Sequence, residues 1–328
     1  MIIDVHTHFI PEPAIEAARA GKIIDGVTLE SESGTDFMVH PTTKMRYPAK
    51  RVLFDREAKL QHMDEAGIDV SILSIMPPWL FHWTPADDAI DYCRTTNDWL
   101  SEFSANSDRL FGMATVPLQS PEAAAIELRR CATDLGLHGV HIGTTVNGLP
   151  LDDERFTPFF EVAEELAVPV TLHPCYSGKP SGLSEFFMNS LVGNPFGTTV
   201  AATRMILSGF LDRYPQLDIV LVHAGGYLPY QAGRLDQGCI AKPEIGEAIE
   251  RRPSEYLDRF HYDTITFSSS QLKLLIDLVG HDRVLLGTDL PASMGDARSD
   301  QVLSGTGLTV DAKLAIECEN AKRLFRLV

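Results

Sequence analysis

The chain has 328 residues, 44% of them hydrophobic and 22% charged, which excludes a disordered polypeptide and allows a large buried core. Lysine and arginine number 28 against 45 aspartate and glutamate residues, so the formal net charge is −17. This balance argues against a nucleic-acid partner, because phosphate binding needs a basic face. A small anionic substrate needs only one or two local arginines and is not excluded.

The cysteines and the first residues predict a cytoplasmic location. Five cysteines, an odd number without a CxxC pair, are typical of reduced thiols. The opening MIIDVHTHFI lacks the basic and long apolar regions of a signal peptide. Because no stretch reaches the roughly 18 apolar residues of a membrane span, we expect no membrane partner.

Short β-branched runs alternate with longer amphipathic stretches along the chain. The runs are apolar on both faces, as expected of parallel strands covered by helices. Eight strands are predicted, at residues 2–9, 70–76, 110–117, 139–144, 169–174, 218–225, 260–265 and 284–289.

Helical patterns separate these strands. They cover residues 56–65, 88–106, 121–135, 156–166, 271–279 and 312–326. The alternation predicts an α/β fold, a (β/α)8 TIM barrel that forms a single domain over residues 1–328. A doubly wound sheet would alternate in the same way, and the polar residues at the strand ends decide between the two.

Residues 10–53 interrupt the alternation of strands and helices. They hold Gly, Ser, Thr and Pro without clear periodicity. A connection of this length in a compact domain is usually functional, and loops at the carboxyl end of a barrel cover its active site. We therefore expect a long insertion after the first strand, forming an arm over the active site or between subunits.

Five metal-binding side chains lie at or near the ends of predicted strands. His6 and His8, two residues apart on the first strand, point to the same side. His173, His223 and Asp289 close the fifth, sixth and eighth strands. The carboxyl ends of barrel strands surround one opening, whereas an open sheet would spread them along a line. Their convergence favours the barrel and predicts a bound divalent cation.

The metal is expected to be a single ion. The fourth strand ends HIGT, without a lysine that could bridge two metals. An inward orientation of His141 in this strand is left open, and the other histidines are interpreted as surface or core residues. Three histidines and one carboxylate suit Zn²⁺ best, with Mn²⁺, Co²⁺ and Fe²⁺ as alternatives.

Four motifs resemble the amidohydrolase superfamily: HTH on the first strand, LHP on the fifth, VHAGG on the sixth and GTDLP on the eighth. More narrowly, they resemble its branch of aminocarboxymuconate-semialdehyde decarboxylase and related aromatic-acid decarboxylases. The segments KLQHMDEAGID, RLFGMATVPLQSPE and LGLHGVHIGT extend the resemblance over nearly the whole chain.

The resemblance implies roles for the residues at the strand ends. His223 is expected to hydrogen-bond the metal-bound water or the substrate as the acid/base, beside four metal ligands: His6, His8, His173 and Asp289.

The resemblance also implies substrate contacts and a homodimer. Arg234 matches an arginine that family members lend to the neighbouring subunit, and Trp83 matches a pocket aromatic. Arg51 is one residue out of register with an arginine that binds the substrate carboxylate, and Lys50 occupies the other candidate position. After GTDLP this chain has Ala292 and Ser293 where the family often has an aromatic, so the pocket is reshaped.

Two reactions suit such a site. In non-oxidative decarboxylation of an unsaturated or hydroxylated aromatic acid, the cation fixes the carboxylate, and His223 or Asp289 assists protonation before CO2 leaves. In hydrolysis or hydration, His223 activates a water that attacks a lactone, amide or unsaturated acid. Arg51 and Arg234 would bind a small anionic carboxylic acid through planar paired hydrogen bonds, which favours decarboxylation.

Overall fold

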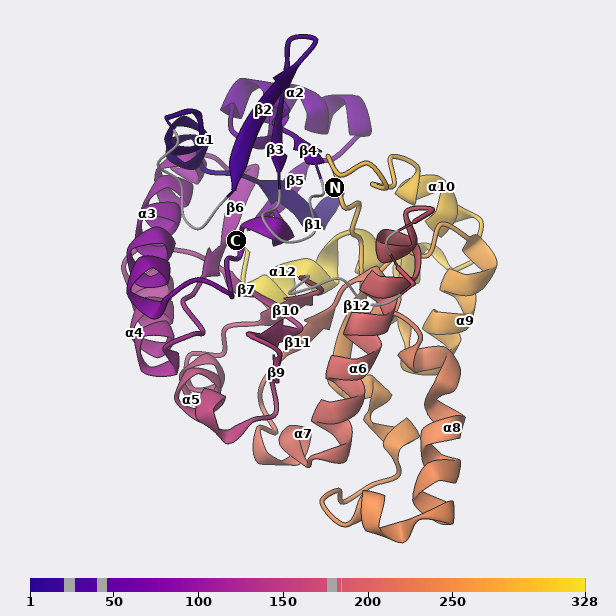
Figure 1. Cartoon of the computed structure of the whole chain (residues 1–328). Coiled ribbons are helices and arrows are strands. Elements are labelled where there is room, and N and C mark those ends of the chain that lie inside the picture. Colours follow the sequence, from indigo (N-terminus) through magenta and orange to yellow (C-terminus); the bar gives the residue numbers. More distant parts are fainter. Residues whose placement is uncertain (21–26, 40–45, 176–181, 184, 328) are drawn as a thin grey trace.

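The computed structural model describes residues 1–20, 27–39, 46–175, 182–183 and 185–327 (Figure 1). Eight parallel strands form one sheet in which strands pair in the order of the chain. They are β1 (Ile3–Phe9), β5 (Val70–Ile75), β6 (Leu110–Thr115), β7 (Gly139–Gly143), β10 (Val170–His173), β11 (Ile219–Leu221), β12 (Phe260–Asp263) and β13 (Val284–Leu285).

The two edges of this sheet meet, so the strands form a barrel. The Val5 amide donates to the Leu286 carbonyl at 3.0 Å, and the His8 amide donates to the Leu290 carbonyl at 2.9 Å. Thr7 also forms a parallel bridge with Leu290. A doubly wound sheet would instead reverse its strand order at a switch point. The predicted TIM-type barrel is therefore confirmed, and each predicted strand contains an observed one.

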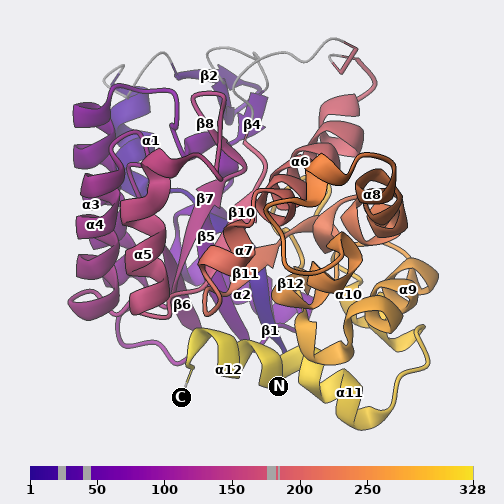
Figure 2. The same cartoon turned by 90° about the horizontal axis from the view of Figure 1, so that it is seen from below.

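Helices surround the strands (Figure 2). Five of the predicted helices agree with observed ones to within two residues at each end: α2 (Arg56–Ala66), α3 (Ala86–Ser104), α4 (Pro121–Thr133), α5 (Thr157–Glu165) and α9 (Ser269–Val279). The sixth, predicted at residues 312–326, is observed as α11 (Val310–Leu314), a π-helical turn (Ala315–Glu319) and α12 (Asn320–Phe325). Two short helices, α7 (Phe210–Arg213) and α10 (Ser299–Ser304), also lie outside the strands.

Two long helices were not predicted. They are α6 (Asn194–Leu207) and α8 (Leu228–Ala241). The sequence of α6 lacks a strongly polar face, and Phe196 and Val200 lie exposed on it. The α8 helix contains Gly233 and Gly238, each of which lowers helix propensity by about 1 kcal/mol relative to alanine.

The insertion after β1 has its own structure. It contains α1 (Glu12–Arg19) and an antiparallel sheet of β2 (Thr28–Glu32), β3 (Thr35–Val39) and β4 (Arg46–Pro48). Because the helix has 8 residues and each strand five or fewer, no period is long enough to be recognised in the sequence. In Figure 2 this sheet lies at the end of the barrel opposite the N-terminus, beyond the carboxyl ends of the strands.

The structure also bears on the membrane prediction. Within the described part of the chain, no helix combines the length and hydropathy needed to cross a bilayer. The cytoplasmic location and the single-domain organisation of residues 1–328 stay predictions.

Candidate metal centre

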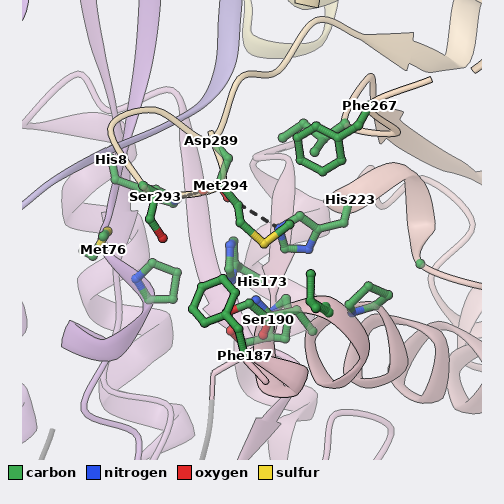
Figure 3. A pocket seen from close by; sticks show the side chains of 18 of the residues that line it. His8, Met76, His173, Phe187, Ser190, His223, Phe267, Asp289, Ser293 and Met294 are labelled. Atoms are coloured by element: carbon green, nitrogen blue, oxygen red, sulfur yellow. Dashed lines mark hydrogen bonds and ion pairs between the residues drawn. The ribbon is translucent and has the colours of Figure 1, made fainter. Parts of the chain in front are cut away.

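The expected metal-binding side chains lie at the carboxyl ends of the strands, and Figure 3 shows His8, His173, His223 and Asp289 among them. His6 and His8 belong to β1, all of whose residues are buried, and His173 is the last residue of β10. His223 follows β11 and Asp289 follows β13. Both have a positive φ, 54° and 58°, a conformation that costs a non-glycine residue about 1–3 kcal/mol. Such turns are typical of functional sites, and here the two side chains line the same cavity as His8 and His173.

Four of these side chains form a cluster of the size that one ion requires. The candidate ligand atoms of His6, His8, His173 and Asp289 all lie within 4.8 Å of one another. Ligand atoms that bind one ion at about 2 Å are about 3–4 Å apart, so small side-chain movements are sufficient. His223 lies beside the cluster, with its Nε2 3.9 Å from Oδ2 of Asp289. The geometry thus separates four candidate ligands from one neighbouring histidine.

The hydrogen bonds of two histidines orient them for metal binding. His6 Nδ1 donates to Oδ2 of Asp263 at 2.7 Å, and His173 Nδ1 donates to the Pro174 carbonyl at 2.9 Å. A neutral imidazole that carries its proton on Nδ1 presents a lone pair on Nε2. Acceptors behind the ring commonly hold metal-ligating histidines in this tautomer.

The remaining contacts also fit a cation. The Nε2 atom of His6 is buried, has no hydrogen-bond partner in the described residues, and lies 3.4 Å from Oδ1 of Asp289. His8 Nε2 is 2.9 Å from the same oxygen, while its Nδ1 is 3.1 Å from Oγ of Ser74. Three imidazole nitrogens and one carboxylate therefore surround one point, and this donor set fits Zn²⁺ or a similar divalent ion.

The electrostatics of the cluster favour binding of a cation. Burial lowers the pKa of His8, and burial together with His223 holds the pKa of His173 well below its usual range. Burial opposes ionisation of Asp289, but His6, His223 and His8 outweigh it and keep the pKa of Asp289 well below its usual range. Burial likewise lowers the pKa of His6, yet Asp289 and a second carboxylate raise it overall. A bound cation would take the position of the proton that His6 binds.

Asp263 is the second carboxylate, and the sequence analysis missed it. It closes β12 and is fully buried. Besides His6, its oxygens accept hydrogen bonds from the backbone amides of His223 at 2.9 Å, Ala224 at 2.7 Å and Ile265 at 3.1 Å. One side chain thus holds both a candidate metal ligand and the strained turn that carries His223.

A buried lysine holds the first strand beneath the site. Lys59 Nζ donates to Oγ1 of Thr7 at 2.8 Å and to the His8 carbonyl at 3.1 Å. Its side chain is buried, and burial lowers its pKa to about 8. This lysine fixes the backbone of the HTH motif.

His141, whose orientation was left open, lies inside the barrel. Its ring centroid is 5.6 Å from that of His173 and 6.2 Å from that of His8. Neither of its ring nitrogens has a hydrogen-bond partner in the part of the chain that the structure describes. It lies near the candidate ligands but outside the four-residue cluster.

The cluster opens into a cavity of about 830 Å³. Lys50 lines this cavity, and its Nζ donates to the Pro291 carbonyl at 3.1 Å. Arg51 is not among the lining residues; its side chain is 74% exposed and forms an ion pair with Asp55. Of the two candidate positions for a substrate-binding cation, the geometry therefore favours Lys50.

The other two expected substrate contacts lie away from the cavity wall. Arg234 is exposed on α8 and does not line the cavity of its own chain. Trp83 is half-buried, with its ring against Phe81, and also lies outside the lining. Their roles stay predictions.

Comparisons with known proteins agree with this geometry. The profile of the amidohydrolase family matches residues 3–327. The chain is 30% identical over 303 residues to a 2-amino-3-carboxymuconate-6-semialdehyde decarboxylase of Dictyostelium discoideum, covering 92% of this chain and 84% of that protein. It is 33% identical over 300 residues to a gamma-resorcylate decarboxylase of Rhizobium sp. (strain MTP-10005), covering 84% and 89%.

A solved structure is similar over almost the whole chain. It is a dihydroxybenzoic acid decarboxylase from Polaromonas sp. JS666 with bound manganese and the inhibitor 2-nitroresorcinol. The TM-score is 0.80 at 27% identity, and the similarity covers 99% of this chain and 97% of that one.

The barrel, the buried His/His/His/Asp cluster and these matches define a metal-dependent enzyme, and the chain belongs to the amidohydrolase family. Within that family it falls in the branch of aminocarboxymuconate-semialdehyde and aromatic-acid decarboxylases, which are non-oxidative carboxy-lyases. The resemblance found in the sequence motifs is confirmed.

Proposed function

We propose that the protein removes CO2 from a small hydroxylated aromatic or unsaturated carboxylic acid. The observation that carries this proposal is the buried His/His/His/Asp cluster, which opens with His223 into one cavity. The similarity to decarboxylases of such acids supports the choice of reaction and substrate class.

We propose one divalent ion, held by His6, His8, His173 and Asp289. The donor set supports Zn²⁺, and the manganese in the Polaromonas relative supports Mn²⁺ as the alternative. When bound, the ion supplies a positive charge that binds the substrate carboxylate and withdraws electron density from it. Metal analysis of protein purified without chelators tests this identity.

His223 is the proposed proton donor. It lines the cavity beside the cluster, and its Nε2 lies 3.9 Å from Oδ2 of Asp289. The ring adds its proton to the substrate carbon that bears the carboxylate, which interrupts the conjugation. The bond from that carbon to the carboxylate then breaks, CO2 leaves, and the electron pair restores the conjugated system.

The substrate anion is proposed to contact Lys50. Arg46 also lines the cavity but is paired with Glu32 at 2.7 Å and stacked over the Phe37 ring, and Arg51 points to solvent. Exchanging Lys50 for Met should raise KM with little change in kcat, because the substrate then binds without its ammonium partner.

The matched change at the neighbouring position, Arg51→Met, separates the two candidates. It should leave KM within about twofold of the parent if Lys50 makes the contact. A raised KM for Arg51→Met with an unchanged KM for Lys50→Met would instead assign the substrate contact to Arg51. Trp83 stays a proposed pocket aromatic, to be tested by Trp83→Ala.

A homodimer is proposed through Arg234. Its guanidinium is exposed on α8, where it could reach a second copy. Mixing inactive Arg234→Ala subunits with inactive His223→Ala subunits should restore part of the activity, because one mixed site would be complete. No recovery would remove the role across subunits.

The reaction itself is tested by product analysis. The protein should release one CO2 per molecule of a hydroxybenzoate or muconate-type acid consumed. Product formed without CO2 would favour the alternative, in which the same histidine and cluster activate a water for hydrolysis or hydration.

A further inference from the structure

The cavity has a polar floor and an apolar outer wall. The floor contains three of the candidate metal ligands, His8, His173 and Asp289, together with His223. The outer wall is formed by the loops and helices that follow β10, β11 and β12. Its large side chains are Phe187, Leu191, Tyr227, Tyr230, Phe267 and Leu274. Figure 3 shows Phe187 and Phe267 around the same opening as His223.

Three hydroxyl groups of this wall form hydrogen bonds within the protein. The Tyr227 hydroxyl donates to the Val192 carbonyl at 3.3 Å, and the Tyr230 hydroxyl donates to the Gln271 carbonyl at 3.2 Å. The Thr266 hydroxyl likewise donates to a backbone carbonyl at 2.9 Å. In the part of the chain that the structure describes, the charged residues that line the cavity are Asp289, Arg46 and Lys50. All three lie outside this wall. A ligand that touches the wall therefore meets mainly hydrocarbon surface, to which Ser190, Asn194 and Gln271 add polar side chains.

Four of the apolar side chains stand partly in solvent. Phe187 is 46% exposed, Leu191 49%, Phe267 42% and Leu274 48%. Grouped exposed apolar residues that rim a pocket usually mark a binding surface. Because these four line the cavity that contains His223, an elongated ligand bound at the metal would cover them.

The size of the cavity also favours an elongated ligand. Its volume of about 830 Å³ lies in the upper part of the range of about 300–1,000 Å³ for pockets that enclose drug-sized ligands. One hydroxylated ring with its carboxylate fills a small part of it. Ala292 and Ser293, small residues after Asp289, also line it.

We propose that the outer wall is a subsite for an apolar substituent of the substrate. The preferred acid then has its carboxylate at the metal centre and an alkyl chain or second ring on the opposite edge of its conjugated system. This inference rests on the proposed decarboxylase function for its orientation, and it adds the class of acid.

A series of acids that differ in one substituent tests the subsite. Metal-loaded enzyme is assayed with 2,6-dihydroxybenzoate and its 4-methyl, 4-propyl and 4-pentyl derivatives. Burying a methylene changes a binding constant about fourfold, so kcat/KM should rise by up to about fourfold per carbon over the first carbons. A flat or falling series would overturn the proposal.

A matched pair of variants tests whether the rise in kcat/KM with chain length depends on the outer wall. Leu274 and Leu278 lie one turn apart on α9 and are 48% and 46% exposed, but only Leu274 lines the cavity. Leu274→Ser should reduce the rise in kcat/KM that each added carbon gives, whereas Leu278→Ser should not alter that rise. Phe267→Ser provides a second test on another element.

Two further measurements separate the inference from its alternatives. Affinity for 2-nitroresorcinol and its 5-alkyl derivatives, measured by calorimetry, should rise with chain length even if no acid is turned over. Such a rise without CO2 release would retain the subsite and refute the decarboxylase. If Leu274→Ser disperses a dimer and preserves the chain-length dependence, the wall is a subunit contact and the subsite is refuted.

Discussion

Exchanging Asp263 for Asn tests whether one buried carboxylate organises the site. Its two oxygens accept four N–H groups, from the His6 ring and from the amides of His223, Ala224 and Ile265. An asparagine is nearly isosteric but can accept through only one oxygen. Its NH2 group must face two donors in either orientation.

The size of the effect follows from the two hydrogen bonds that asparagine cannot accept. Hydrogen bonds to a charged acceptor contribute about 1.5–3 kcal/mol each, so Asp263→Asn should lower the free energy of unfolding by about 3–6 kcal/mol. If the amide NH2 faces His6, that ring loses its acceptor, and loss of such a partner typically weakens metal binding about 10- to 100-fold. If it faces Ala224 and Ile265, the turn that carries His223 is disturbed and kcat falls instead.

The assay combines metal titration, CO2 release and urea denaturation. Asp218→Asn is the matched control, because Asp218 also pairs with a histidine ring, His261 at 3.2 Å, but precedes β11 at the other end of the barrel. The control should keep the metal affinity and kcat of the parent. An Asp263→Asn protein with parental metal affinity and parental kcat would refute the reasoning.

Three other outcomes are expected. His223→Ala should lower turnover about 10²- to 10⁴-fold with metal content unchanged by mass spectrometry, and metal loss would instead make His223 a ligand. Removing the ion with a chelator should abolish activity and lower the melting temperature, and free metal at about 100 times its Kd should restore about 2.7 kcal/mol; an unchanged melting temperature would contradict a folded-state site. The pKa of Lys59 is about 8 when folded and 10.5 when unfolded, so the unfolded chain binds more protons between these values and stability rises with pH, by up to about 3 kcal/mol. Lys59→Met should lack this rise in urea titrations at pH 8 and 10, and equal slopes would exclude Lys59 as its source.

The strands and the clustered ligands could be predicted because buried parallel strands are continuous apolar runs. Each run ends where polar side chains can meet, and His173 closes its strand as expected. Asp263 carries the same signal, since it lies two residues before the end of its predicted strand as His223 does, but it was not selected as a candidate. The observed strand ends at Asp263 itself.

The direction of side chains in irregular segments could not be predicted. Lys50 and Arg51 lie where a three-residue helical turn begins, and no repeating period there assigns one of them to the cavity. The carbonyl of Pro291, which binds Lys50, is distant in the chain and comes close only through the fold. Long-range contacts of this kind leave no local pattern.

The position of the metal cluster along the chain has a consequence for assembly. His8 and Asp289 are 281 residues apart, and both lie at the seam where β1 meets the segment after β13. Closing a loop of that length costs about 5 kcal/mol of chain entropy. A bound ion would therefore link β1, the first strand of the barrel, to the segment after β13, the last strand. It can bind only after nearly the whole polypeptide has folded. Depleting it should accelerate amide hydrogen exchange along this seam before the strands on the far side of the barrel respond.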